Sequence, residues 1–148
     1  MTREDVVSIL HGPLEPHSEQ LREMAIEGSW RLSQRFAPAD LLVYDNYNFV
    51  VSGWTYTGKP GDAFLSLAVA SYHASICFLS GVHLSDPEKR LRGGGNLVRN
   101  LRLDSLDLLE DPYVSSLIDD AAAMSKRGDC QGRVILKSVS AKKRRPRG

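Results

Sequence analysis

The chain has 148 residues, of which 42% are hydrophobic and 25% charged, and its formal net charge at pH 7 is +1. These values suit one ordinary globular domain with a single core. No apolar run approaches the roughly 20 residues that a membrane span needs, and the first residues show no apolar signal segment. We therefore expect a cytoplasmic protein without a membrane partner.

Charge and cysteine usage refine this picture. Five of the 19 Lys and Arg residues lie in 142–147, which leaves 14 basic against 18 acidic residues in the rest of the chain. We expect one domain over 1–139 and a basic, disordered tail over 140–148. Cys77 lies in an apolar stretch and Cys130 in an expected loop. Two unpaired thiols suit a reducing compartment better than a disulfide scaffold.

Helical patterns open the chain. Thr2 can cap a short first helix that Gly12-Pro13 ends, and Ser18 can open a longer helix that runs to about Phe36. The spacing of apolar residues predicts a buried stripe on the longer helix, made of Leu21, Met24, Ala25, Gly28, Leu32 and Phe36. A short helical piece is expected around 39–44, before the chain turns extended.

Strand patterns fill the centre of the chain. Segments rich in β-branched and aromatic residues predict strands over 49–57, 63–70, 72–80, 97–103 and 133–139. The short connection at residue 71 predicts a hairpin, and Asp111-Pro112 predicts the start of a last helix. Strands in sequence with helices at both ends indicate an α+β fold. We expect one antiparallel sheet of about five strands, packed against the N-terminal and C-terminal helices.

Short motifs between Leu41 and Ala123 occur in a recognisable order. They are Val43-Tyr44-Asp45-Asn46-Tyr47-Asn48, the stretch 73–84, Asp86-Pro87, Leu91-Arg92-Gly93-Gly94-Gly95, Val98-Arg99, 101–105 and Asp111-Pro112. Over more than half of its length, the chain thus resembles the YdhG-like family, a bacterial domain family of largely unassigned function. Family members commonly carry a lysine and a histidine where this chain has Asn96 and Asn100, so no ligand role is carried over to those two positions.

The resemblance carries expectations about fold and function. It implies a compact sheet packed on helices, similar in outline to frataxin. Some relatives are described as frataxin-like iron chaperones, which implies a link with iron handling. Glu15, Glu19, Glu23 and Glu27 repeat every four residues, and an acidic ridge of this kind is what such an iron binder would use. A solvated helix face with a Glu27–Arg31 ion pair is the simpler interpretation.

Two polar clusters are candidate ligand sites. The first contains Tyr44, Asn46, Tyr47 and Asn48, whose phenols and amides could line a pocket; the alternative is a turn, because Asn and Asp bond readily to nearby backbone. In the second, the glycine run 93–95 could hold an anion with Arg99 as a clamp. The alternative there is a flexible loop.

Patterns for metal binding and catalysis do not occur. The four histidines and two cysteines lack the spacing of a metal site, no nucleophile elbow is present, and neither cysteine adjoins a helix start or basic cluster. We therefore predict a non-enzymatic protein without a cofactor, which binds a small ligand or acts like a chaperone. The alternatives are an enzyme acting on a small anion and an interaction module whose basic tail contacts protein or nucleic acid. A protein partner is favoured over nucleic acid there, and homodimer formation is left open.

Overall fold

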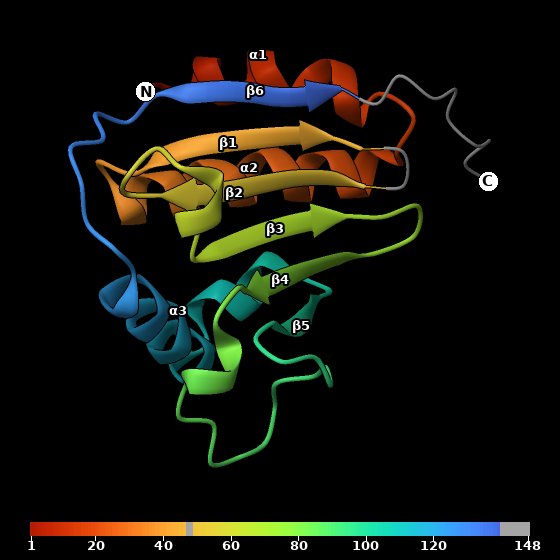
Figure 1. Cartoon of the computed structure of the whole chain (residues 1–148). Helices are drawn as coiled ribbons and strands as arrows, with labels where there is room; N and C mark the ends of the chain where they lie inside the picture. The colour runs from red at the N-terminus through yellow and green to blue at the C-terminus, as the bar shows by residue number, and fades with distance from the viewer. Residues whose placement is uncertain (47–48, 140–148) are drawn as a thin grey trace.

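The computed structural model describes residues 1–46 and 49–139. Three helices, α1 (Arg3–Leu14), α2 (Glu19–Phe36) and α3 (Pro112–Met124), accompany six strands in this part of the chain. The strands are β1 (Asp40–Asp45), β2 (Val50–Thr55), β3 (Leu65–Val69), β4 (Ala74–Phe78), β5 (Arg99–Leu103) and β6 (Val134–Val139). The expected α+β class is confirmed (Figure 1).

Capping residues set the helix starts as predicted. Thr2 and Asp5 form a capping box at the start of α1, and the Ser18 hydroxyl accepts from the Leu21 N–H at the start of α2. The Asp111 carboxylate caps α3, with proline as the first helical residue. The predicted stripe of α2 is buried throughout. Helix α1 extends past Gly12-Pro13 to Leu14, where the expectation was an end at the Gly-Pro pair.

The sheet differs from the expected one in strand number and direction. Its six strands lie in the order β5-β4-β3-β2-β1-β6. Neighbours from β1 to β5 are antiparallel, whereas β6 pairs with β1 in parallel. The predicted hairpin is confirmed as β3–β4. The prediction of about five antiparallel strands is therefore wrong in these two respects, and the sheet is mixed.

The additional strand is β1, where a short helical piece was expected. Leu41, Leu42 and Val43 are all buried, because one face of this strand packs on the helices and the other is also covered. A continuous apolar run of this length has no strand alternation, so periodicity cannot distinguish a doubly buried strand from a helix. Pairing with β2 on one side and β6 on the other makes it an internal strand.

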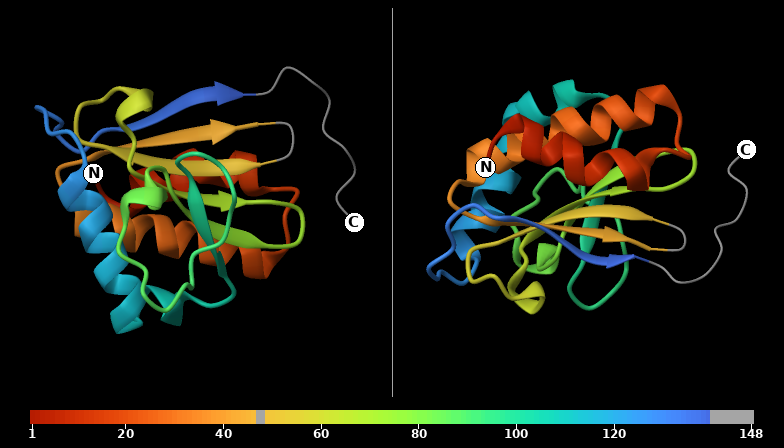
Figure 2. Two further views of the ribbon diagram at one scale, coloured as in Figure 1. Left: turned by 60° about the horizontal axis from the view of Figure 1, so that its bottom comes forward. Right: turned by 90° about the horizontal axis from the view of Figure 1, so that it is seen from above.

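Helices α1 and α2 lie on one face of the sheet, as the view from above shows (Figure 2). Two buried hydrogen bonds join α2 to β2: Ser29 Oγ donates to Ser52 Oγ at 2.9 Å, and Trp54 Nε1 donates to Ser33 Oγ at 2.9 Å. Helix α3 joins the C-terminal end of α2 through Arg35, which contacts the Asp119 carboxylate at 2.8 Å. No helix in the described residues is long and apolar enough to cross a membrane.

Candidate functional site

The structure places the Tyr44–Asn48 cluster at the connection between β1 and β2. Burial raises the pKa of Tyr44, and the Asn46 N–H donates to the Phe49 carbonyl at 2.8 Å, which closes a strand-to-strand turn. Tyr47 and Asn48 lie outside the described residues. Neither Tyr44 nor Asn46 lines the cavities described below. A ligand-binding role for this cluster stays a prediction.

Arg99 lies in β5, far from that cluster. Four inter-strand steps separate β5 from β1, which amounts to about 19 Å. The Arg99 guanidinium donates to the Gly95 and Val98 carbonyls at 2.7 and 2.8 Å, so it holds the glycine loop itself. The structure thus does not bring Arg99 together with Tyr44, and its predicted role as an anion clamp is left without support from this geometry.

The acidic ridge lies along a groove of about 830 Å³ between α1 and α2. Glu27 accepts from Arg31 at 3.0 Å and from Arg3 at 3.2 Å, and these two bonds hold its pKa below the ordinary value. The predicted Glu27–Arg31 pair is confirmed. In the part of the chain that the structure describes, no group of three or more His, Cys, Asp and Glu residues could hold a metal ion.

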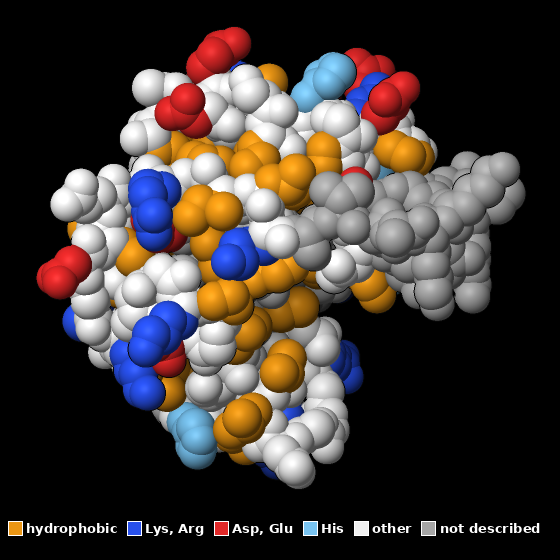
Figure 3. Space-filling view, turned by 45° about the horizontal axis from the view of Figure 1, so that its top comes forward, with side chains coloured by type: hydrophobic (Ala, Val, Ile, Leu, Met, Phe, Trp, Pro, Cys, Tyr) orange, Lys and Arg blue, Asp and Glu red, His pale blue; other side chains and the backbone are white. Residues whose placement is uncertain are grey.

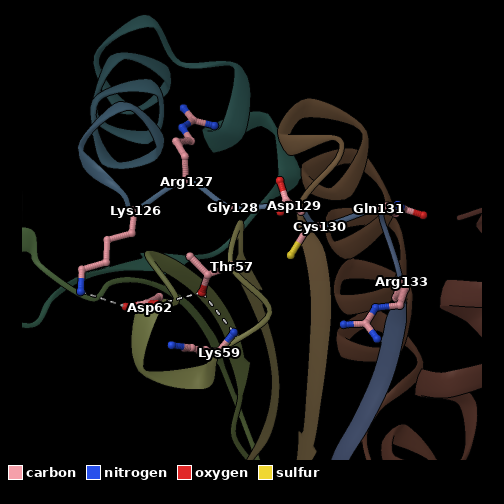
Figure 4. A pocket seen from close by; sticks show the side chains of 10 residues that line it. All are labelled: Thr57, Lys59, Asp62, Lys126, Arg127, Gly128, Asp129, Cys130, Gln131 and Arg133. Carbon is pink, nitrogen blue, oxygen red and sulfur yellow. Dashed lines mark hydrogen bonds and ion pairs between the residues drawn. The ribbon is translucent and has the colours of Figure 1, made fainter.

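A second concentration of charge, mostly positive, lies at the opposite end of the sheet from the β1–β2 turn. Here a cavity of about 810 Å³ opens between residues 57–62, which connect β2 to β3, and residues 126–133, which connect α3 to β6 (Figure 4). Four cationic side chains line this basic pocket: Lys59, Lys126, Arg127 and Arg133. In the space-filling view, Lys and Arg side chains gather on the left flank, where these two segments lie (Figure 3).

Close backbone packing brings the two segments together. Tyr56 and Arg127 form an isolated parallel bridge, and a Cβ on Gly128 would lie 2.9 Å from the Tyr56 carbonyl oxygen. Only glycine therefore permits this approach without movement of the backbone. Gly58, with φ of +81°, turns the chain at the facing position. The close approach of the two segments thus requires glycine at position 128, and the turn beside it favours glycine at position 58.

Arg127 stabilises this junction. Its guanidinium lies 4.0 Å from the centre of the Tyr56 ring and donates to the Ala122 carbonyl at 3.3 Å, near the end of α3. Figure 4 shows the side chain turned toward α3. Arg127 thus adds positive charge to the pocket while its guanidinium is engaged by the protein.

A fully buried carboxylate lies behind the lining of the pocket, in contact with Arg133. Asp40, with a relative exposure of 0%, accepts from the Arg133 backbone N–H at 2.8 Å and from the Arg133 guanidinium at 3.1 Å. A buried carboxylate needs such partners. The Arg133 side chain is itself 65% exposed, so much of its guanidinium remains accessible to a ligand.

Both cysteines are held as thiols. Cys130 lines the pocket. Burial is the main cause that raises the pKa of its thiol, and the neighbouring Asp40 carboxylate is the next. Burial likewise raises the pKa of Cys77 in β4. Since the thiolate is the nucleophilic form, neither side chain is activated at neutral pH.

The wall of the pocket away from Arg133 contains Asp62, Thr57 and two lysines, Lys59 and Lys126. Thr57 Oγ1 donates to Asp62 Oδ2 at 2.8 Å, and Lys126 Nζ lies 3.8 Å from Asp62 Oδ1. Lys126 is 80% exposed, so this ion pair is weak and its ammonium is free to turn to another anion. Lys59 is also exposed. Four cations against Asp62 and Asp129 give the lining a net charge of +2, and the buried Asp40 behind Arg133 reduces this to +1.

Sequence reasoning missed this pocket because its charges are far apart in the chain. Gly58-Lys59 and Lys126-Arg127-Gly128 each place cations beside a glycine, which is the one local signal available. Nothing in the sequence shows that the two motifs face each other, because this depends on the parallel pairing of β6 with β1. No family model, curated protein or solved structure matches the chain, so the YdhG-like resemblance stays a prediction.

Proposed function

We propose that this protein binds a small anionic ligand in the basic pocket, without catalysing its conversion. The observation that carries the proposal is the arrangement of Lys59, Lys126 and Arg133 around one cavity of about 810 Å³. Pockets of this size are typical of small-molecule sites. The resemblance to a family with chaperone-like relatives and the two thiols favour a cytoplasmic binding protein, which we include in the proposal.

The charges of the pocket support an anion over a cation. The carboxylates of Asp40, behind the lining, and of Asp62, in the lining, already have cationic partners at 3.1 and 3.8 Å. The exposed charges that remain are mostly Lys and Arg, which provide several donors for phosphate or carboxylate oxygens. An ammonium group suits a tetrahedral anion as a mobile point charge, and a guanidinium adds a fixed pair of donors.

The absence of an activated nucleophile supports binding without chemistry. Cys130 is the pocket's thiol, and the causes that raise its pKa keep it protonated. The exposed lysines lie where water reaches them, which is unlike the desolvated position of a catalytic lysine.

A thermal-shift titration with inorganic phosphate tests the proposal. Phosphate at about a hundred times its dissociation constant adds about 2.7 kcal/mol, which raises the melting temperature by about 5–10 °C for a chain of this size. The variant Lys59→Gln/Lys126→Gln should weaken binding about five- to thirtyfold, which corresponds to about 1–2 kcal/mol for two exposed pairs. Lys89→Gln/Lys137→Gln changes the net charge equally outside the pocket and serves as the control. Equal weakening in both variants would show nonspecific charge binding and refute the site.

A further inference from the structure

A second cavity adjoins the basic pocket. It has a volume of about 360 Å³ and shares Asp62 and Lys126 with its neighbour. Its other side chains are mostly apolar but include three polar ones: the apolar residues are Ala63, Phe64, Phe78, Leu84, Ala121 and Met124, and the polar residues are Ser80, His83 and Ser125. The two cavities therefore meet at Asp62 and Lys126. The cations lie on one side, and on the other lies the apolar cavity, whose lining has no further Lys, Arg, Asp or Glu among the described residues.

From this arrangement we propose that the ligand is an amphipathic anion, with its charged group in the basic pocket and an alkyl or aryl group in the apolar cavity. The inference rests on the proposed function and adds the class of ligand to it. Burial of apolar surface beside a few placed polar groups is the usual composition of a small-molecule site. The basic pocket by itself would not select between inorganic phosphate and an organic phosphate.

The boundary between the cavities can open. The Lys126–Asp62 contact of 3.8 Å involves an 80% exposed lysine, so its rupture costs little. Once Lys126 turns toward the anion, a neutral part of the ligand can pass beside Asp62. The Asp62 carboxylate stays in place because the Thr57 hydroxyl donates to it at 2.8 Å.

Asp62 also restricts the ligand. Its side chain is 18% exposed and lines both cavities, so it repels a second negative charge there. A ligand with one charged end fits, whereas a molecule with an anion at both ends does not.

Calorimetric titration of the full chain with methyl, butyl and hexyl phosphate tests the inference. Each methylene buried in the apolar cavity should tighten binding by up to about fourfold, and the gain should level off when the cavity is full. Butane-1,4-diyl bisphosphate should bind no more tightly than methyl phosphate.

Two variants separate the cavities. Ala63→Leu places added bulk at the half-buried lining of the apolar cavity, and should abolish the gain with chain length while methyl phosphate binds as before. Met124→Gln, at a 48% exposed position, should reduce the gain without a folding defect. Lys59→Gln, which lines the basic pocket alone, should weaken all three monophosphates by the same factor.

The possible results distinguish the two proposals. Equal affinity for the three alkyl phosphates would overturn the amphipathic ligand and leave anion binding intact. Binding that grows with chain length but ignores Lys59→Gln would refute the basic pocket as the site of the anion. If none of the phosphates binds, both proposals fail.

Discussion

The pair formed by Asp40 and Arg133 gives the sharpest test of how the pocket is built. Asp40 is fully buried at the start of β1, and it accepts two hydrogen bonds from Arg133, just before β6. The pair therefore joins β1 to β6, the first and last strands in chain order, and holds Arg133 in the lining of the basic pocket. Its removal should destabilise the fold as well as the site.

The magnitude follows from burial and from the number of bonds. Asp40→Ala removes the acceptor of two hydrogen bonds from Arg133 and leaves the Arg133 backbone N–H without the carboxylate. We therefore expect the free energy of unfolding to fall by about 3 kcal/mol. Asp40→Asn keeps the shape and one acceptor and should cost about 1–2 kcal/mol. Arg133→Met leaves a buried charge, but the 65% exposure of the guanidinium limits the cost to about 2 kcal/mol.

Urea unfolding followed by tryptophan fluorescence measures these values, because Trp54 is fully buried in the core. The loss in Asp40→Ala corresponds to a melting temperature lower by about 6–12 °C. The double variant should show a coupling of at least about 1 kcal/mol between the two positions. An Asp40→Ala variant within about 0.5 kcal/mol of the wild type would refute the reasoning.

Three further predictions concern other parts of the structure. Gly128→Ala should cost about 1–3 kcal/mol and weaken phosphate binding in the same sample, because its Cβ would meet the Tyr56 carbonyl; unfolding and titration data that match the wild type would contradict this. Burial raises the pKa of Asp86, but bonds from the Tyr113 hydroxyl and nearby backbone outweigh it and lower the pKa overall, so its stabilising effect is full above its unfolded value of 3.8 and is lost as pH falls through the folded value. Asp86→Asn should flatten the acid limb of a plot of stability against pH. In a Cys77→Ser background, Asp40→Asn should lower the pKa of Cys130 and speed its alkylation at pH 8, since the neighbouring carboxylate raises that pKa; unchanged rates would exclude this cause.

Local signals predicted the helices and most strands. Ser18 and Asp111 cap α2 and α3 as expected, because the preference of short polar side chains for helix starts depends on the adjacent backbone alone. The β3–β4 hairpin was equally local, since residue 71 lies in a short connection between two strand patterns. These elements needed no information from distant parts of the chain.

The remaining features depend on distant pairing. Strand β1 was not predicted, because residues that are buried on both faces show no alternation. The sequence predicted a strand at β6 but not that it runs parallel to β1. Prediction of the basic pocket required the pairing of these two strands, because Lys126 and Arg133 face Lys59 only when β6 lies beside β1. The candidates chosen from the sequence, Tyr44 and Arg99, were conspicuous by residue type, which gives no distance between them.

The parallel docking of β6 has a consequence for the order of assembly. Contacts between Asp40 and Arg133 close a loop of 93 residues, whereas the hairpins of the sheet close within a few residues. Because distant contacts form after local ones, the basic pocket should be completed in the final step of folding. Ligand capture would then report on whether a molecule has finished folding, and an intermediate with intact helices and hairpins would remain empty.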